Sequence, residues 1–130
     1  MTQILGPLNA TGFHTPASGD LNAHLTVWAT EGDYTITGDY LAFGNLTDNC
    51  NTLTPQSDPS RLATNFFNAG ITDNGANVPG RDPDFYNQLG FDIATLDVPE
   101  GLIGHGATGA SVCLGTTSDT YFFGGLTFER

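Results

Sequence analysis

The sequence predicts an all-β protein, an antiparallel β-sandwich or jelly roll with one short helix, formed as a single domain over residues 1–130. Three observations lead to this fold class. Several short segments alternate apolar and polar residues, 17 glycines and many asparagines supply turns between them, and one segment alone carries helix-start residues. A crossover α/β fold would need more helices than this pattern predicts.

The clearest strand lies in the first half of the chain. Residues 21–30, LNAHLTVWAT, are apolar at every second position and carry Trp28 on the opposite, polar face. Residues 31–33 end this strand, and residues 34–45 are read as two short strands interrupted by a Gly-Asp pair. Residues 45–60, rich in Asn and Asp, are predicted to form a long loop.

The second half begins with the predicted helix. Residues 58–68, DPSRLATNFFN, start with an aspartate and a proline and continue with apolar residues spaced to share one face. Residues 72–87 are read as a loop, and strands are predicted at 88–96, 110–116 and 121–128. We expect the following side chains to point into the core: Leu25, Val27, Phe91, Ile93, Val112, Leu114 and Phe128.

The charge balance excludes several functions. The chain has no lysine, three arginines and 14 Asp and Glu residues, for a formal net charge of -11. Binding to nucleic acid or to anionic lipid relies on Lys and Arg, so we expect neither. The same absence excludes lysine Schiff-base chemistry and Lys to Asn isopeptide bonds. No apolar stretch is long enough for membrane insertion, and we expect any export signal to lie outside this sequence.

The two cysteines predict a disulfide. Neither Cys50 nor Cys113 has a nearby histidine or a metal-binding spacing. A bridge within one chain would close a loop of 63 positions (113 minus 50). The chain-entropy model assigns such a bridge about 4 kcal/mol. A bridge between subunits and two free thiols are the alternatives, and any bridge implies an oxidising compartment.

Two kinds of ligand site are candidates. Asp73, Asp82 and Asp84 lie in predicted loops, where carboxylates and carbonyl groups could bind Ca²⁺, although turns use the same residues without any metal. Trp28 on a polar strand face could stack on a sugar ring, or it could be covered by the segment that contains Phe66 and Phe67. No nucleophile-elbow motif is present, and we expect no enzymatic activity and no required cofactor.

The N-terminal residues 1–10 carry Ile4 and Leu8 and end near glycine and proline. They are read either as an edge strand or as an arm that adds a strand to a second copy of the chain. Such a donor arm would join copies head to tail into a homopolymer. A sandwich without lysine also has fewer means of protecting its edge strands.

Three segments together resemble one known kind of module. In order, they are TGFHTPASGDLNAHLTVWATEGDYTITGDYL, NFFNAGITDNGANVPGRDPDFYNQLGFDIATLDV and GATGASVCLGTTSDTYFFGGLTF. They resemble a β-rich module of large bacterial surface and secreted adhesin-like proteins, found beside conserved repeat domains of unknown function. The resemblance covers about Thr11 to Phe128 and implies an extracellular structural or adhesive role with no catalytic residues. Cys113 departs from the family pattern, because it takes an outward strand position where a polar residue is more usual.

We therefore expect an extracellular, cell-surface structural or adhesive module that assembles with other copies or with neighbouring surface domains by strand addition. The alternative is a calcium-dependent carbohydrate-binding module. Clustered exposed Trp and Tyr residues with nearby aspartates would favour the alternative, whereas an apolar terminal arm and self-assembly would favour the structural role.

Overall fold

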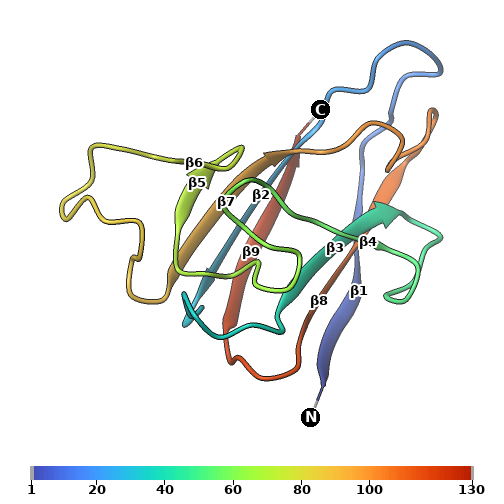
Figure 1. Ribbon diagram of the computed structural model, residues 1–130. Coiled ribbons are helices and arrows are strands. Elements are labelled where there is room, and N and C mark those ends of the chain that lie inside the picture. Colours follow the sequence, from blue (N-terminus) through green and yellow to red (C-terminus); the bar gives the residue numbers. More distant parts are fainter. Residues whose placement is uncertain (1, 130) are drawn as a thin grey trace.

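The computed structural model describes residues 2–129 as two β-sheets packed face to face (Figure 1). Sheet A has the strand order β1-β8-β3-β4, and sheet B has the order β6-β5-β7-β2-β9. All neighbouring strands are antiparallel except β5 and β7. The predicted β-sandwich is confirmed. The strands are β1 (Gln3–Thr11), β2 (His24–Thr30), β3 (Tyr40–Asn45), β4 (Thr54–Pro55), β5 (Ile71–Asp73), β6 (Ala76–Asn77), β7 (Phe91–Asp97), β8 (Gly109–Thr116) and β9 (Phe122–Glu129).

Strand β2 lies in the interior of sheet B, between β7 and β9, and follows the alternation in its sequence. Leu25, Val27 and Ala29 are buried, whereas Trp28 on the other face is 37% exposed. A strand with one apolar face buries that face against the second sheet and leaves the other toward solvent. The inward positions predicted for β2 are therefore correct.

One hydrophobic core fills the space between the two sheets. It joins Leu25 and Val27 of β2 to Phe43 of β3 and to Val112 and Leu114 of β8. Phe128 packs against this cluster with its ring centroid 5.6 Å from that of Phe43. The inward positions predicted on β8 and β9 are thus correct as well.

The register predicted for β7 is wrong. Asp92, Ala94 and Leu96 point inward, while Phe91 is 41% exposed and Ile93 is partly exposed on the outer face. The physical reason is the buried ion pair of Asp92, whose Oδ1 lies 2.9 Å from Nη1 of Arg61. A one-residue shift would bury both apolar side chains but would expose Asp92 and leave the charge of the buried arginine without its carboxylate partner.

The helix predicted at residues 58–68 is absent, and no residue in the range 2–129 is helical. Asp58 does accept backbone hydrogen bonds at the start of the segment, from the N–H groups of Ser60 and Arg61. Beyond this turn, however, Arg61 takes the carbonyl of Phe66, and Asp39 accepts from the N–H of Phe67. Tertiary hydrogen bonds therefore replace those of a helix, which local propensity cannot anticipate.

Some predicted elements differ in extent. The first strand predicted within residues 34–45 does not form, because Asp33 accepts hydrogen bonds from the backbone N–H groups of Thr35 and Ile36 and bends the chain there. The short strands β4, β5 and β6 lie in segments predicted to be mostly loop. The remaining predicted strands form with boundaries shifted by a few residues.

The N-terminal segment is an edge strand in this structure. Strand β1 pairs with β8 of the same chain, so Ile4 and Leu8 belong to the chain's own sandwich and not to a free arm. Residue 1, part of the predicted arm, lies outside the described residues. The reason for the pairing is that β8 would otherwise present an unpaired edge beside the core.

The disulfide joins Cys50 to Cys113 within the chain, with the two Cα atoms 5.5 Å apart. Cys113 points away from the main core, as predicted, but it is fully buried by the loop that carries Cys50. With Ala42 and Leu53 it forms a second small apolar cluster on the outer face of sheet A, which we call the covered face. A buried structural disulfide is typical of proteins from oxidising compartments.

Candidate functional site

The outer face of sheet B carries a set of exposed side chains that no other segment covers within residues 2–129. We call it the bare face. It presents side chains in rows across β7, β2 and β9, as the strand register requires. The members of these rows are Phe91, Thr30 and Phe122, then Ile93, Trp28 and Gly125, then Thr95, Thr26 and Thr127, and last Asp97, His24 and Glu129.

Aromatic side chains occupy one end of the bare face. Trp28 is 37% exposed, Phe91 41% and Phe122 64%. In the strand register Phe91 and Phe122 are the neighbours of Thr30 on either side, and Trp28 is two residues along β2. The three aromatic side chains therefore lie at the same end of the bare face, on three adjacent strands, and we call them the aromatic platform.

Two glycines let the indole of Trp28 lie close against strand β9. A Cβ atom on Gly124 would lie 2.3 Å from Cδ1 of the indole, and one on Gly125 would lie 2.3 Å from Cζ2. The pairing of β2 with β9 is also irregular at this point, where the register shifts between Trp28 and Ala29. Only residues without a side chain permit this close approach. The two glycines thus determine how closely the indole of Trp28 lies against the backbone of β9.

Hydroxyl groups follow the aromatic residues along the face. The Oγ1 atoms of Thr26 and Thr95 are hydrogen-bonded at 3.0 Å, and Thr127 is the register partner of Thr26 on β9. Such a row of threonines is uncharged and offers both donors and acceptors. The face therefore changes along the strands from aromatic to polar.

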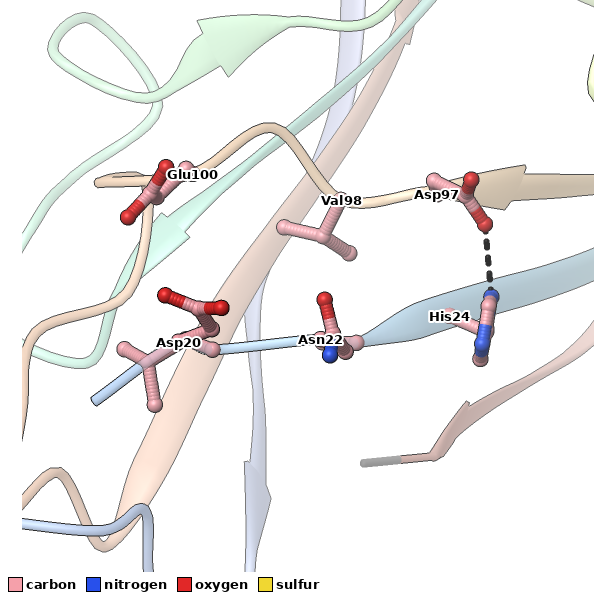
Figure 2. A pocket seen from close by; sticks show the side chains of 8 residues that line it. Asp20, Asn22, His24, Asp97, Val98 and Glu100 are labelled. Atoms are coloured by element: carbon pink, nitrogen blue, oxygen red, sulfur yellow. Dashed lines mark ion pairs between the residues drawn. The ribbon is translucent and has the colours of Figure 1, made fainter.

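The polar end of the face leads into a hollow of about 570 Å³ (Figure 2). Nδ1 of His24 lies 2.7 Å from Oδ1 of Asp97, at one side of this hollow. The carboxylates of Asp20 and Glu100 lie at the other side, with Asn22 between the two ends. The backbone N–H of Asp97 also donates to Oδ1 of Asn74 at 2.7 Å, which ties the end of β7 to the β5–β6 turn.

The calcium candidates are not brought together into a site. Asp73 lies on β5, whereas Asp84 accepts a hydrogen bond from the N–H of Gly80 and lies 3.5 Å from Nη2 of Arg81. Asp82 precedes a proline in the same loop and is exposed. Among residues 2–129, no group of three His, Cys, Asp or Glu side chains is placed to hold a metal ion.

A second concentration of polar groups is fully buried and has a structural role. The guanidinium of Arg61, 1% exposed, donates to Oγ1 of Thr72, to Oδ1 of Asp92 and to three backbone carbonyls. These carbonyls belong to Phe66, Gly70 and Ile93. A buried arginine is tolerated only when its donors are satisfied in this way. Arg61 therefore ties the irregular segment to sheet B.

Burial alters the acid–base behaviour of three carboxyl groups. Desolvation raises the pKa of Asp39 to about 6, although a hydrogen bond from the N–H of Phe67 opposes the shift. Desolvation also raises the pKa of Asp92 and that of Asp119 above the usual range. Asp39 is fully buried and Asp92 is 1% exposed. Asp39 and Asp92 therefore lie within the protein and present no surface for a ligand.

Of the residues considered for a sugar site, the structure leaves Trp28 accessible and buries the two phenylalanines that could have covered it. Trp28 is exposed on the bare face, and Phe66 and Phe67 do not cover it, because both are fully buried in the core. The sequence analysis missed Phe91 and Phe122 as surface residues. For Phe122, its place beside Phe123 was a usable signal, because adjacent residues of a strand point to opposite faces.

Comparisons with known proteins add no further assignment. No family model, no curated protein and no solved structure matches this chain. Within residues 2–129, the structure contains no helix that is long and apolar enough to span a membrane.

Proposed function

We propose that this chain is an extracellular structural and adhesive module that assembles with further copies by exchanging its N-terminal strand. The observation that carries the proposal is the position of β1. It is the first strand of the chain, it lies at the edge of sheet A, and its pairing partner is β8. Its apolar side chains Ile4, Leu5 and Leu8 remain 53%, 48% and 37% exposed.

Strand β8 needs a partner at this edge. All eight of its residues are buried, and its backbone groups on the β1 side are satisfied by β1. The same strand from a second copy would satisfy the same groups in the same register. Exchange therefore requires no contact surface beyond the one that β1 and β8 already form. Because the donated strand β1 and the accepting edge of β8 are different surfaces, copies join head to tail.

The backbone pairing of β1 with β8 is divided into two short stretches. The register shifts between Leu5 and Leu8, so residues 3–5 and residues 8–11 form separate ladders with β8. Each ladder is shorter than an average strand. A terminal strand that is attached by two short ladders, with exposed side chains, can detach from its own sheet and pair with β8 of another copy.

The expected location rests on two further points. The disulfide between Cys50 and Cys113 is of the kind that persists in oxidising compartments. The resemblance to modules of bacterial surface proteins supports the same compartment and a structural or adhesive role. With a net charge of -11, copies repel one another, so assembly should strengthen as salt screens the charges.

A pair of introduced cysteines tests strand exchange. Gln3 and Thr116 are register partners, so a Gln3→Cys and Thr116→Cys variant can form a new bridge between β1 and β8. After incubation at high protein concentration, we expect a covalent ladder of oligomers on a non-reducing gel. The single Gln3→Cys variant should give dimers at most. Monomers alone at every concentration would refute the proposal.

A further inference from the structure

The bare face supports an inference that is independent of strand exchange, since it lies on sheet B and β1 lies on sheet A. We propose that the bare face binds a neutral polysaccharide of flat, β-1,4-linked sugar rings. The platform of Trp28, Phe91 and Phe122 stacks on the C–H faces of the rings, and the threonine row and the His24–Asp97 pair bind their hydroxyl groups.

The aromatic platform is the first argument. Trp28, Phe91 and Phe122 come from three adjacent strands and are 37%, 41% and 64% exposed. The fold does not require these side chains at the surface, because the core is completed by other residues. Exposed apolar side chains that gather on one face of a protein, with polar groups beside them, are typical of an interaction surface.

The chemistry beside the platform selects a polyol over an apolar ligand. Within residues 2–129, the indole N–H of Trp28 and the hydroxyls of Thr30 and Thr127 take part in no hydrogen bond. They lie next to the apolar rings and can bind the hydroxyl groups of a ligand. A ligand with both apolar faces and many hydroxyls satisfies both parts of this surface, and a sugar has this combination.

Charge excludes an anionic ligand. None of the five strands of sheet B contains Lys or Arg, and the face ends in Asp97 and Glu129. Acidic glycans and nucleic acids would be repelled. The centre of the face carries only aromatic, aliphatic and hydroxyl side chains, which suits a neutral ligand better than a lysine-rich peptide that needs a continuous acidic surface.

The dimensions favour a chain over a single sugar. From Thr30 to His24 the face extends six residues along β2. At about 3.3 Å per residue this distance is about 20 Å. The polar hollow of Figure 2 continues the same line beyond His24, with Asp20, Asn22 and Glu100 as further hydrogen-bonding groups. A flat ribbon of several rings can therefore lie along β2.

The fluorescence of the full chain provides the test, because Trp28 is the only tryptophan and lies within the proposed site. Titration with cellohexaose, xylohexaose and mannohexaose should change the Trp28 emission in a saturable way for at least one of them. Polymannuronate, an anionic β-1,4-linked chain, should give no saturable change. Pull-down on insoluble cellulose then distinguishes binding to a crystalline surface from binding to a free chain.

Two phenylalanine variants form a matched pair. Phe122→Ala removes a platform residue that is 64% exposed, and Phe85→Ala removes a residue that is 67% exposed in the loop before β7. We expect Phe122→Ala to weaken binding about tenfold, as loss of one stacking partner does elsewhere, and Phe85→Ala to leave it unchanged. Neither change removes a buried side chain, so both variants should fold.

Three results would overturn the inference. The first is no binding of any neutral oligosaccharide by the folded chain. The second is equal binding by the Phe122→Ala and Phe85→Ala variants. The third is saturable binding of a lysine-rich peptide in place of the sugars, which would assign the face to a basic protein partner. None of these results bears on the covalent ladder expected for strand exchange, so the two proposals fail separately.

Discussion

The two sheets treat their outer faces in opposite ways. On the covered face of sheet A, the loop with Cys50 lies over Ala42, Leu53 and Cys113, and all three are buried. On the bare face of sheet B, Trp28 remains exposed within an aromatic platform. A loop that is fixed by a disulfide therefore covers the apolar outer face of sheet A. No such loop covers the outer face of sheet B within residues 2–129. This open face is the one that a ligand can reach.

Removing the disulfide that fixes the loop over the covered face should have the largest effect on the free energy of unfolding. We expect a Cys50→Ala and Cys113→Ala variant to lose about 4 kcal/mol of unfolding free energy, the entropy contribution of a bridge that closes a loop of 63 positions. Urea unfolding measures the loss. The reduced wild-type chain is the control and should match the variant. Equal stability of the variant and the oxidised wild type would mean that the cover holds without the bridge.

A pair of phenylalanines compares the interior with the bare face directly. Phe43→Ala removes a fully buried side chain and should cost about 3 to 5 kcal/mol. Phe91 is 41% exposed, so Phe91→Ala should cost about 1 kcal/mol. Chemical denaturation of the two variants gives the difference. Similar losses at both positions would show that β7 has the register predicted from the sequence and not the observed one.

Burial also affects a carboxyl group in the interior, that of Asp39, which no solvent reaches as it does the bare face. The pKa of Asp39 is raised to about 6 from 3.8, so its proton is bound more tightly in the folded chain. Its contribution to stability is therefore full below about pH 4 and is lost as the pH rises through about 6. We expect the chain to gain at most about 3 kcal/mol between pH 7 and pH 4.

Thermal unfolding across this pH range measures the effect, and Asp39→Asn serves as the control. The variant should lose the share of the pH dependence that comes from Asp39. The raised pKa values of Asp92 and Asp119 act in the same direction and will leave a residual slope. An unchanged slope in the variant would contradict the assignment to Asp39.

The smallest effect is expected on the bare face. Phe122→Ala should change the unfolding free energy by less than about 0.5 kcal/mol, because the side chain is 64% exposed. Differential scanning calorimetry against the wild type provides the measurement. A loss above about 2 kcal/mol would show that Phe122 supports the fold, and the face would then not be free for a ligand.

Local sequence patterns predicted the elements whose environment is simple. The strict alternation in β2 has an apolar partner sheet on one side and solvent on the other, so Leu25 and Val27 were assigned correctly. The all-β class followed from the same kind of pattern. The predicted disulfide is confirmed as a bridge within the chain, although this pairing depends on a loop that folds over β8, which spacing alone does not specify.

Two of the errors, the register of β7 and the helix at residues 58–68, trace to one buried arginine. Arg61 binds Asp92, which lies 31 positions away, and this pair turns Asp92 inward and Phe91 outward. The same guanidinium takes the carbonyl of Phe66 and so prevents the predicted helix. A local pattern contains no information about a partner so distant in sequence. Phe91 was missed as a surface residue for the same reason, because its orientation depends on the register of β7, whereas Phe122 lies on β9 and could have been recognised from its place beside Phe123.

The placement of the arginines also affects how well the domain resists proteolysis outside a cell. Trypsin-like proteases cut after lysine or arginine, and the chain has no lysine. Within residues 2–129 the two arginines are Arg61, sealed in the interior, and Arg81, whose side chain is 14% exposed and bound to the carbonyls of Ile71 and Phe85. A protease of this specificity cuts only after the chain opens, so at a low protease concentration the rate of tryptic cleavage reports the fraction of chains that are open.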